Sequence, residues 1–136
     1  MTERGTITLW VLGLCLMMLL VGGISLDLWR AFSERRSLAA AADAAALAGS
    51  AAIDEEAFRT GGVVRLNRVE AERRARASLA AQFDVEAMRS AEVEVSATTV
   101  RVEISGDVDF TLLTLADPGA PLEIRVAATA EPVRSP

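Results

Sequence analysis

An uninterrupted apolar run lies close to the amino end of the chain. No charged residue occurs between Gly5 and Leu26. At about 1.5 Å of helical rise per residue this run extends about 33 Å, enough to cross a hydrocarbon core of about 30 Å. Backbone groups inside a bilayer find no water, so the segment must be helical. The pattern predicts a transmembrane helix over residues 5–26 after a short tail, residues 1–4.

The run has the features of an anchor rather than of a removable signal peptide. A signal peptide has an apolar core of about 7–15 residues and a small-x-small cleavage site directly after it. Here a polar segment, 27–30, follows at once, and small triplets begin only after Ser37. The basic residues give only a weak signal for the orientation of the helix in the membrane. Arg4 lies before the apolar run, and Arg30, Arg35 and Arg36 lie after it, so the positive-inside rule mildly favours a cytoplasmic location for the part of the chain after the run.

The helical pattern continues beyond the apolar run, as an extension over residues 27–52. No Pro or Gly interrupts it before Gly49, and it ends in an alanine-rich stretch of strong helix formers. Two interpretations of the alanines stay open. They form a thin face that lies on the sheet of the same domain, or a smooth stripe along which neighbouring copies pack. Asp43 interrupts the stripe, either as a solvated carboxylate or as a pairing group within an assembly.

A small domain is expected over residues 53–136. Residues 54–62 read as an acidic loop with a glycine turn, and residues 63–66 as an edge strand. Asn67 is a good N-cap for a second helix, and Glu70 three residues later completes a capping box. Glu–Arg pairs at i, i+4 support this helix on its wet side. Its buried face is predicted to comprise Ala71, Ala75, Leu79 and Phe83.

Alternation dominates the rest of the chain. Between Val100 and Leu112 every even position is apolar or Gly and every odd position is polar, which predicts a strand with one dry face. Similar alternation over residues 92–97 and 122–130 predicts strands before and after it, the latter following a turn at residues 117–119. A hairpin through Ala97 would place Glu94 opposite Arg101. The predicted fold class is α+β: a long membrane helix extending into a head with one further helix on a three- to four-stranded antiparallel sheet.

Composition narrows the chemistry. All 14 basic residues are Arg, there is no His, and the net charge is −5. An acidic domain repels phosphate backbones, so nucleic acid is not expected as a partner. The single Cys15 lies in the apolar run, which excludes a disulfide within the chain and a Cys/His metal site. Asp107 and Asp109 point outward by alternation, as solvated charges. We therefore expect no catalytic, cofactor or metal site, and no enzyme activity.

The amino-terminal third resembles the Flp/Tad pilus-assembly TadE/TadG-like family. The resemblance covers Arg4 to Ala52, and its most specific part is the string Ala-Ala-Asp-Ala-Ala-Ala-Leu-Ala-Gly over residues 41–49. The residues assigned to the family motif and to helix packing are Asp27, Arg30, Arg36, Ala42, Asp43, Ala46, Leu47 and Gly49.

The resemblance implies a single-pass protein of the plasma (inner) membrane with its amino terminus in the cytoplasm and a pilin-like head outside. Its implied partners are the bilayer and pilin or Tad-system membrane components, with a homo- or hetero-oligomer formed through the first helix. It also implies prepilin-peptidase cleavage between Gly5 and Thr6. The family's cleaved members carry Glu as the fifth mature residue, where this chain has Trp10. The chain is too short for the von Willebrand factor A-type domain of longer members.

Three functional hypotheses follow. The chain is a minor pilin or pseudopilin-like subunit, or a membrane-bound assembly factor that never enters the filament. The alternative is a membrane-tethered envelope sensor or binding module unrelated to pili.

Overall fold

The computed structural model describes residues 3–82, 88–108, 110 and 122–132. Within these residues the chain forms helices and then strands in the order α1 (Glu3–Ser50), α2 (Glu55–Gly61), α3 (Arg68–Ala81), β1 (Met88–Val95), β2 (Val100–Val108) and β3 (Leu122–Ala130). This arrangement confirms the predicted α+β class. Phe83, Asp109, Leu112 and the turn at residues 117–119 lie outside the described residues.

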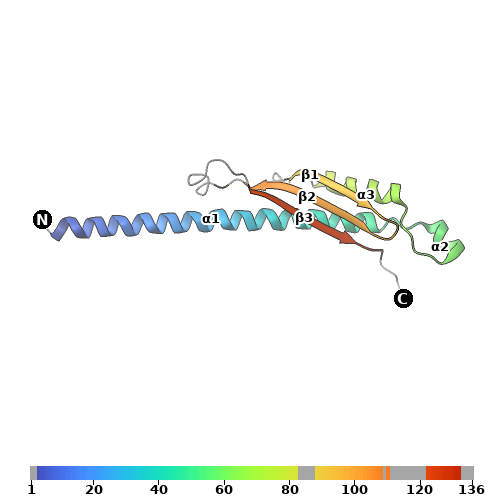
Figure 1. The fold of residues 1–136 in the computed structure, drawn as a ribbon, viewed down its shortest axis with the longest axis horizontal. Coiled ribbons are helices and arrows are strands. Elements are labelled where there is room, and N and C mark those ends of the chain that lie inside the picture. Colours follow the sequence, from blue (N-terminus) through green and yellow to red (C-terminus); the bar gives the residue numbers. More distant parts are fainter. Residues whose placement is uncertain (1–2, 83–87, 109, 111–121, 133–136) are drawn as a thin grey trace.

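Helix α1 is the axis of the molecule. It is continuous over 48 residues, which corresponds to about 72 Å of helical rise. Its amino-terminal half projects alone, and the sheet, α3 and α2 are gathered around its carboxyl-terminal half (Figure 1). The helix runs without a break through Gly22 and Gly23 and ends one residue after Gly49. The apolar run and the alanine-rich stretch are therefore parts of one rod.

The three described strands form an antiparallel sheet in the order β1-β2-β3, with β2 in the centre. The tight hairpin between β1 and β2 places Glu94 opposite Arg101, as the sequence predicts. Strands β2 and β3 pair without a shift from Val100 opposite Ala130 to Val108 opposite Leu122. The dry face of β2 is buried at every second residue and the other face is wetter, which confirms the alternation.

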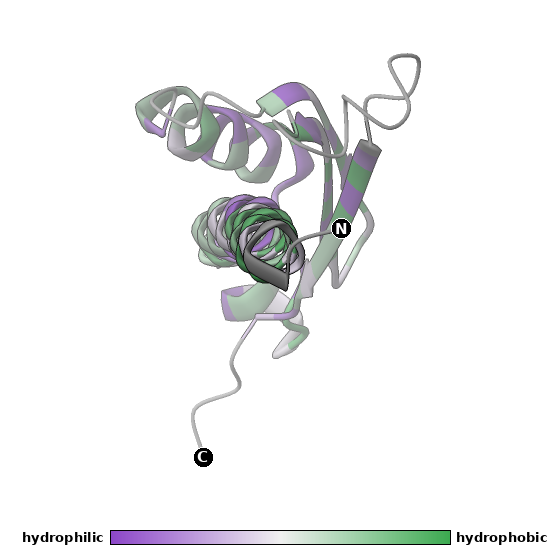
Figure 2. Ribbon diagram, turned by 90° about the vertical axis from the view of Figure 1, so that its left-hand side faces the viewer, coloured by the Kyte–Doolittle hydropathy of each residue, from purple (hydrophilic) through white to green (hydrophobic). Residues whose placement is uncertain are grey.

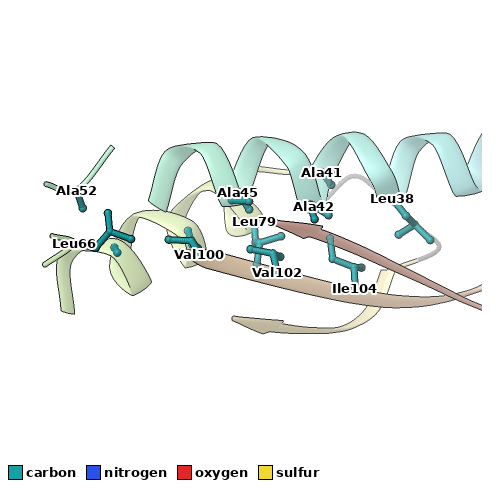
Figure 3. Packing of buried hydrophobic residues seen from close by; sticks show 14 residues of the cluster. Leu38, Ala41, Ala42, Ala45, Ala52, Leu66, Leu79, Val100, Val102 and Ile104 are labelled. Carbon is teal, nitrogen blue, oxygen red and sulfur yellow. The ribbon is translucent and has the colours of Figure 1, made fainter. Parts of the chain in front are cut away.

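The core lies between this dry face and one side of α1. Leu38, Ala41, Ala42 and Ala45 of α1 point at Val100, Val102 and Ile104 of β2 (Figure 3). Each of these residues is at most 1 % exposed. Alanine is the side chain that allows a helix to lie this close to a sheet, because it adds one methyl group to the backbone. The alanine stretch therefore serves as a packing face within the chain itself.

Helix α3 covers the rest of the dry face and presents Ala71, Ala75 and Leu79 to the core, as predicted. The Asn67 side chain accepts a hydrogen bond from the Glu70 backbone N–H at 3.2 Å, which confirms the N-cap. The prediction that Glu70 completes a capping box with Asn67 is wrong. The Asn67 N–H donates instead to the Ala52 carbonyl at 2.9 Å, and the Glu70 carboxylate is occupied by two arginines of its own helix.

The segment between α1 and α3 differs from its prediction in two ways. Residues 55–61 form helix α2 rather than an acidic loop: Asp54 caps it by accepting from the Glu56 and Ala57 N–H groups, and Gly62 ends it in the left-handed conformation. The expected edge strand at residues 63–66 is reduced to a single bridge between Leu66 and Ile53. Leu66 nevertheless enters the core, with 5 % exposure.

Candidate membrane anchor and interaction surface

The amino-terminal half of α1 is bare on all sides. From Thr6 to Leu26 almost every side chain is exposed, although the segment is apolar. Seen end-on, the near part of α1 is hydrophobic around its whole circumference (Figure 2). In water this would be unfavourable at about 25 cal/mol for each Å² of apolar surface. Among the described residues one helix, α1, is long and apolar enough to cross a membrane.

Two features mark the end of the bare half. Ser25 donates its hydroxyl to the Val21 carbonyl at 2.8 Å, so this polar group is satisfied inside the helix. One turn later Trp29 and Phe32 are 69 % and 67 % exposed. Large aromatic side chains at such a position suit the headgroup region of a bilayer. On the opposite side of the helix Asp27 is 2 % exposed, beneath the head. The bare half and the head therefore meet within two helical turns.

The residues assigned to the family motif divide between two faces of α1. Four of them are buried on the side of the head: Asp27, Ala42, Ala46 and Gly49. Four are exposed: Arg30, Arg36, Asp43 and Leu47. The first group has a place in the structure of the chain itself. The second group lies on surface that the head leaves uncovered, and its role stays a prediction.

Arg36 and Asp43 form the charged part of this uncovered surface. They are seven positions apart in the sequence, so they differ by only about 20° around the helix. Neither forms an ion pair with any residue that the structure describes. The positions three and four residues away from each carry no opposite charge either, which excludes pairing within the helix. Leu47 continues the same strip and is 63 % exposed.

The wet face of the sheet is acidic and partly frustrated. Glu92 lies opposite Glu103 across β1 and β2, and Asp107 lies opposite Glu123 across β2 and β3. Like charges placed directly opposite each other are unfavourable. Arg89 offsets one pair, because its guanidinium lies 2.7 Å from the Asp107 Oδ2. Arg101 and Arg125 also lie 3.8 and 3.1 Å from Glu103 and Glu123, so much of the negative charge on this face is offset by neighbouring arginines.

A shallow hollow of about 560 Å³ lies at the end of the molecule that is distant from the bare half of α1. Its charged groups are already paired: Arg59 with Glu55 at 3.0 Å, and Arg74 with Glu70 at 2.7 Å. Hydrogen bonds from Arg73 and Arg74 lower the pKa of Glu70 to about 2. The hollow therefore offers little free charge to a ligand. Its lining comprises Ala51, Ala52, Ile53, Glu55, Phe58, Arg59, Asn67, Glu70 and Arg74.

The predicted cleavage position lies at the start of α1. Gly5 already lies within the helix, and the side chain of Thr6 is exposed. Trp10, in the place of the expected glutamate, is 77 % exposed. Cleavage itself stays a prediction. No group of three or more His, Cys, Asp or Glu residues within the described ranges is arranged to hold a metal ion.

Comparison with known proteins agrees with this division of the chain. Neither the curated proteins nor the solved structures contain a match to it. The family model described as Flp pilus-assembly TadE/G-like matches residues 5–52. These residues comprise the bare half of α1, the half that carries the head and the two residues that follow. The amino-terminal segment of this protein, residues 5–52, is thus similar to the Flp pilus-assembly TadE/G-like family.

Proposed function

We propose that the protein is a non-enzymatic, single-pass membrane subunit that assists the assembly of Flp/Tad-type pili or a related secretion apparatus. Residues 5–26 anchor it in the plasma membrane, its amino terminus lies in the cytoplasm, and the head lies outside. The observation that carries this proposal is the division of one helix into a bare apolar half and a half covered by the head. The family match supplies the pathway.

The division supports a fixed anchor rather than a flexible tether. Because α1 passes from bare surface into the core without a break, the head cannot rotate away from the anchor without losing the contacts of Leu38 and the alanines with β2. A head held in this way presents its surfaces at a defined height above the lipid. Positioning of this kind suits a protein that aligns other subunits.

Fractionation and topology mapping test the anchor and its orientation. We expect the full chain in the membrane fraction, released by detergent and not by high salt or alkaline carbonate. Alkaline phosphatase fused to the carboxyl end should be active, because that enzyme requires export, whereas a fused green fluorescent protein should stay dark. Release without detergent, or the opposite reporter pattern, contradicts the proposal.

A deletion strain tests the role in assembly. We expect loss or a strong reduction of Flp-type pili in electron micrographs, with restoration by the full chain in trans. Normal piliation in the deletion strain, together with normal secretion through the related apparatus, would favour the sensor or binding module.

The presence of Trp10 in place of glutamate favours the membrane-bound assembly factor over a processed subunit. Intact-mass measurement of the protein purified from membranes distinguishes the two. A mature chain that begins at Thr6 indicates peptidase processing, and a chain that keeps Gly5 indicates a permanent membrane component. In a strain without the prepilin peptidase the processed form should disappear.

A further inference from the structure

The exposed charges of α1 directly after its bare half are all arginines. The charged residues between positions 27 and 42 are Asp27, Arg30, Glu34, Arg35 and Arg36. Asp27 is 2 % exposed, and Glu34, seven positions later on the same side of the helix, is half-buried. The three arginines are exposed. Both carboxylates therefore lie on the side of the head, and the uncovered side of this segment is positive in a chain whose net charge is −5.

Two of these arginines are not neutralised by the described part of the chain. Arg35 and Arg36 form no ion pair with any residue that the structure describes, whereas four arginines of α2 and α3 pair with glutamates. Glu34 precedes Arg35 directly, but adjacent residues of a helix do not face each other. The next exposed acid along α1 is Asp43, seven positions beyond Arg36. The two guanidinium groups are therefore available to an anionic partner.

The same two arginines lie close above the proposed bilayer span. They follow Leu26 by nine and ten residues, about 14 Å along an upright helix. The headgroup layer adds about 5–8 Å to each side of the hydrocarbon core. Helical side chains lean toward the amino end of their helix, which for α1 is the direction of the membrane, and long arginine stems carry the charge to a polar boundary. Both guanidinium groups are thus placed to reach the level of the lipid headgroups.

Exposed aromatic side chains lie between the arginines and the apolar run. Phe32 and Trp29 precede Arg36 by four and seven positions, which places all three on one side of α1. The two rings are 67 % and 69 % exposed. Along this side the helix changes from apolar to aromatic to cationic. A leaflet changes in the same direction from acyl chains through the interfacial region, where aromatic residues collect, to phosphates.

The rest of the head does not oppose an anionic surface at this level. At the end of the sheet nearest the bare half (Figure 1), Asp107 lies 2.7 Å from Arg89 and Glu123 lies 3.1 Å from Arg125. Three consecutive acids, residues 54–56, lie at the opposite end of the molecule, at the start of α2. The described charges are therefore arranged with free arginines next to the anchor and a carboxylate cluster far from it.

We propose that Arg35 and Arg36 bind the phosphate groups of anionic phospholipids in the leaflet that the head faces. Trp29 and Phe32 lie among the headgroups below them. A guanidinium suits this ligand, because it keeps its charge and donates several N–H groups to phosphate oxygens. Lipids bound in this way hold the rod at one depth and the head on the membrane surface. The inference rests on the proposed function in one respect, the anchoring of residues 5–26, and adds a lipid preference that apolar burial does not require.

Spin-labelled lipids test the preference. The full chain is reconstituted in phosphatidylcholine vesicles with a trace of spin-labelled phosphatidylglycerol or spin-labelled phosphatidylcholine, and electron paramagnetic resonance measures the share of label that the protein immobilises. We expect phosphatidylglycerol to associate several-fold more strongly, and about 1 M salt to weaken this preference by screening. Arg35→Gln/Arg36→Gln should remove most of it. Equal association of the two lipids with the native chain overturns the proposal.

Two further variants separate a local site from total charge. Arg65 and Arg68 are exposed, have no ion pair among the described residues and lie beyond the carboxyl end of α1. Arg65→Gln/Arg68→Gln removes the same charge far from the bilayer and should leave the preference unchanged. Arg35→Lys/Arg36→Lys should retain most of it. All substituted side chains are exposed, so the head should stay folded, which circular dichroism checks. Equal loss in the two glutamine variants, or loss in neither, contradicts the proposal.

Tryptophan quenching tests the depth. Trp10→Phe leaves Trp29 as the single tryptophan. Its fluorescence should be quenched more strongly by lipids brominated near the headgroup than by lipids brominated near the chain end. The reverse order, or no quenching by either lipid, would place this part of α1 away from the headgroups and overturn the arrangement.

The two proposals fail in different ways. A chain that stays in the membrane and restores piliation, but shows no lipid preference, removes the phospholipid site and leaves the proposed function intact. Recovery of the chain in the soluble fraction removes the anchoring, and the proposed function with it.

Discussion

The two halves of α1 share a backbone conformation and differ in what surrounds them. The amino-terminal half is bulky, rich in leucine, methionine and valine, and exposed on every side. The carboxyl-terminal half has one face of Leu38 and alanines that is almost completely buried against β2 and α3 (Figures 1 and 3). Lipid accepts large side chains at any angle around the helix, whereas a sheet accepts only those that fit its surface.

The comparison predicts that the same substitution has different consequences in the two halves. In the covered half a change of volume alters a packed interior, which has few voids and adapts poorly. In the proposed membrane setting of the bare half, the lipid acyl chains around it are fluid and adapt to a change of shape. Matched pairs of substitutions, one in each half, should therefore differ in their effect on the free energy of unfolding of the head, measured on the detergent-solubilised full chain.

Removal of a buried leucine should give the largest effect. Leu38 is 0 % exposed, whereas Leu26, at the end of the bare half, is 62 % exposed. Leu38→Ala should lower the free energy of unfolding of the head by about 2–5 kcal/mol, because it loses apolar burial and leaves a cavity beside Ile104. Leu26→Ala should change it little. Denaturant titration followed by near-UV circular dichroism measures both. Equal effects would show that the head does not depend on α1.

Enlargement of an alanine should have an intermediate effect. Ala45 is buried against β2, whereas Ala44, the preceding residue in the sequence, is exposed. The two alanines therefore differ mainly in what surrounds their side chains. Ala45→Leu should cost about 1–3 kcal/mol by forcing the helix and sheet apart. Ala44→Leu should be close to neutral. The same denaturant titration applies, and a stable Ala45→Leu head would mean that α1 and the sheet separate easily.

Much of the difference between the two halves of α1 can be predicted from the sequence, because it depends on the size of the side chains and on the spacing of the apolar residues. The uncharged run from Gly5 to Leu26 identifies the bare half, and the period of two from Val100 onward identifies the sheet and its dry face. The Asn67 cap and the Glu94–Arg101 register also follow from local rules, since they involve residues close together in the chain.

What the sequence does not reveal is which side of α1 faces the sheet. Alanines occur around much of the helix, so the local sequence around Ala44 and Ala45 is nearly the same. Ala45 is nevertheless buried and Ala44 exposed. The division of the motif into head-facing and uncovered residues is a tertiary property. The signal for α2 is local and present in the sequence: Asp54 before two glutamates is the start of a short helix, and Gly61-Gly62, seven residues on, is its end.

The glycines of α1 also have different surroundings in the two halves. A Cβ at Gly49 would lie 3.0 Å from Val100 Cγ1 and 3.1 Å from the Ala71 carbonyl oxygen, whereas a Cβ at Gly22 would meet nothing within 4 Å. Gly49→Ala should lower head stability by about 1–2 kcal/mol, since the crowding outweighs the gain in helix propensity. Gly22→Ala should leave the head unchanged. Increased head stability in Gly49→Ala would mean that α3 can move away from α1.

The smallest expected effect is the loss of stability at acid pH, which should affect the head and leave the bare half of α1 unchanged. No carboxylate occurs between Thr6 and Leu26, so protonation cannot alter the bare half through its own side chains. In the head, Arg73 and Arg74 lower the pKa of Glu70 from 4.5 to about 2. A carboxylate with a lowered pKa adds stability that is fully present above its unfolded pKa and is lost as the pH falls through its folded pKa.

The stability that Glu70 supplies should therefore be present above pH 4.5 and disappear between pH 4.5 and about 2. Glu70→Gln should destabilise the head slightly at neutral pH and approach the native chain at the acid end of this range. Glu72→Gln, which breaks a single pair with Arg76, is the matched control and should have a smaller effect. The carboxyl carbon resonance of Glu70, followed by NMR against pH, measures the pKa directly. A midpoint near 4.5 would show that the two arginines are not held against Glu70 in solution, and the difference between the variants should then vanish at every pH.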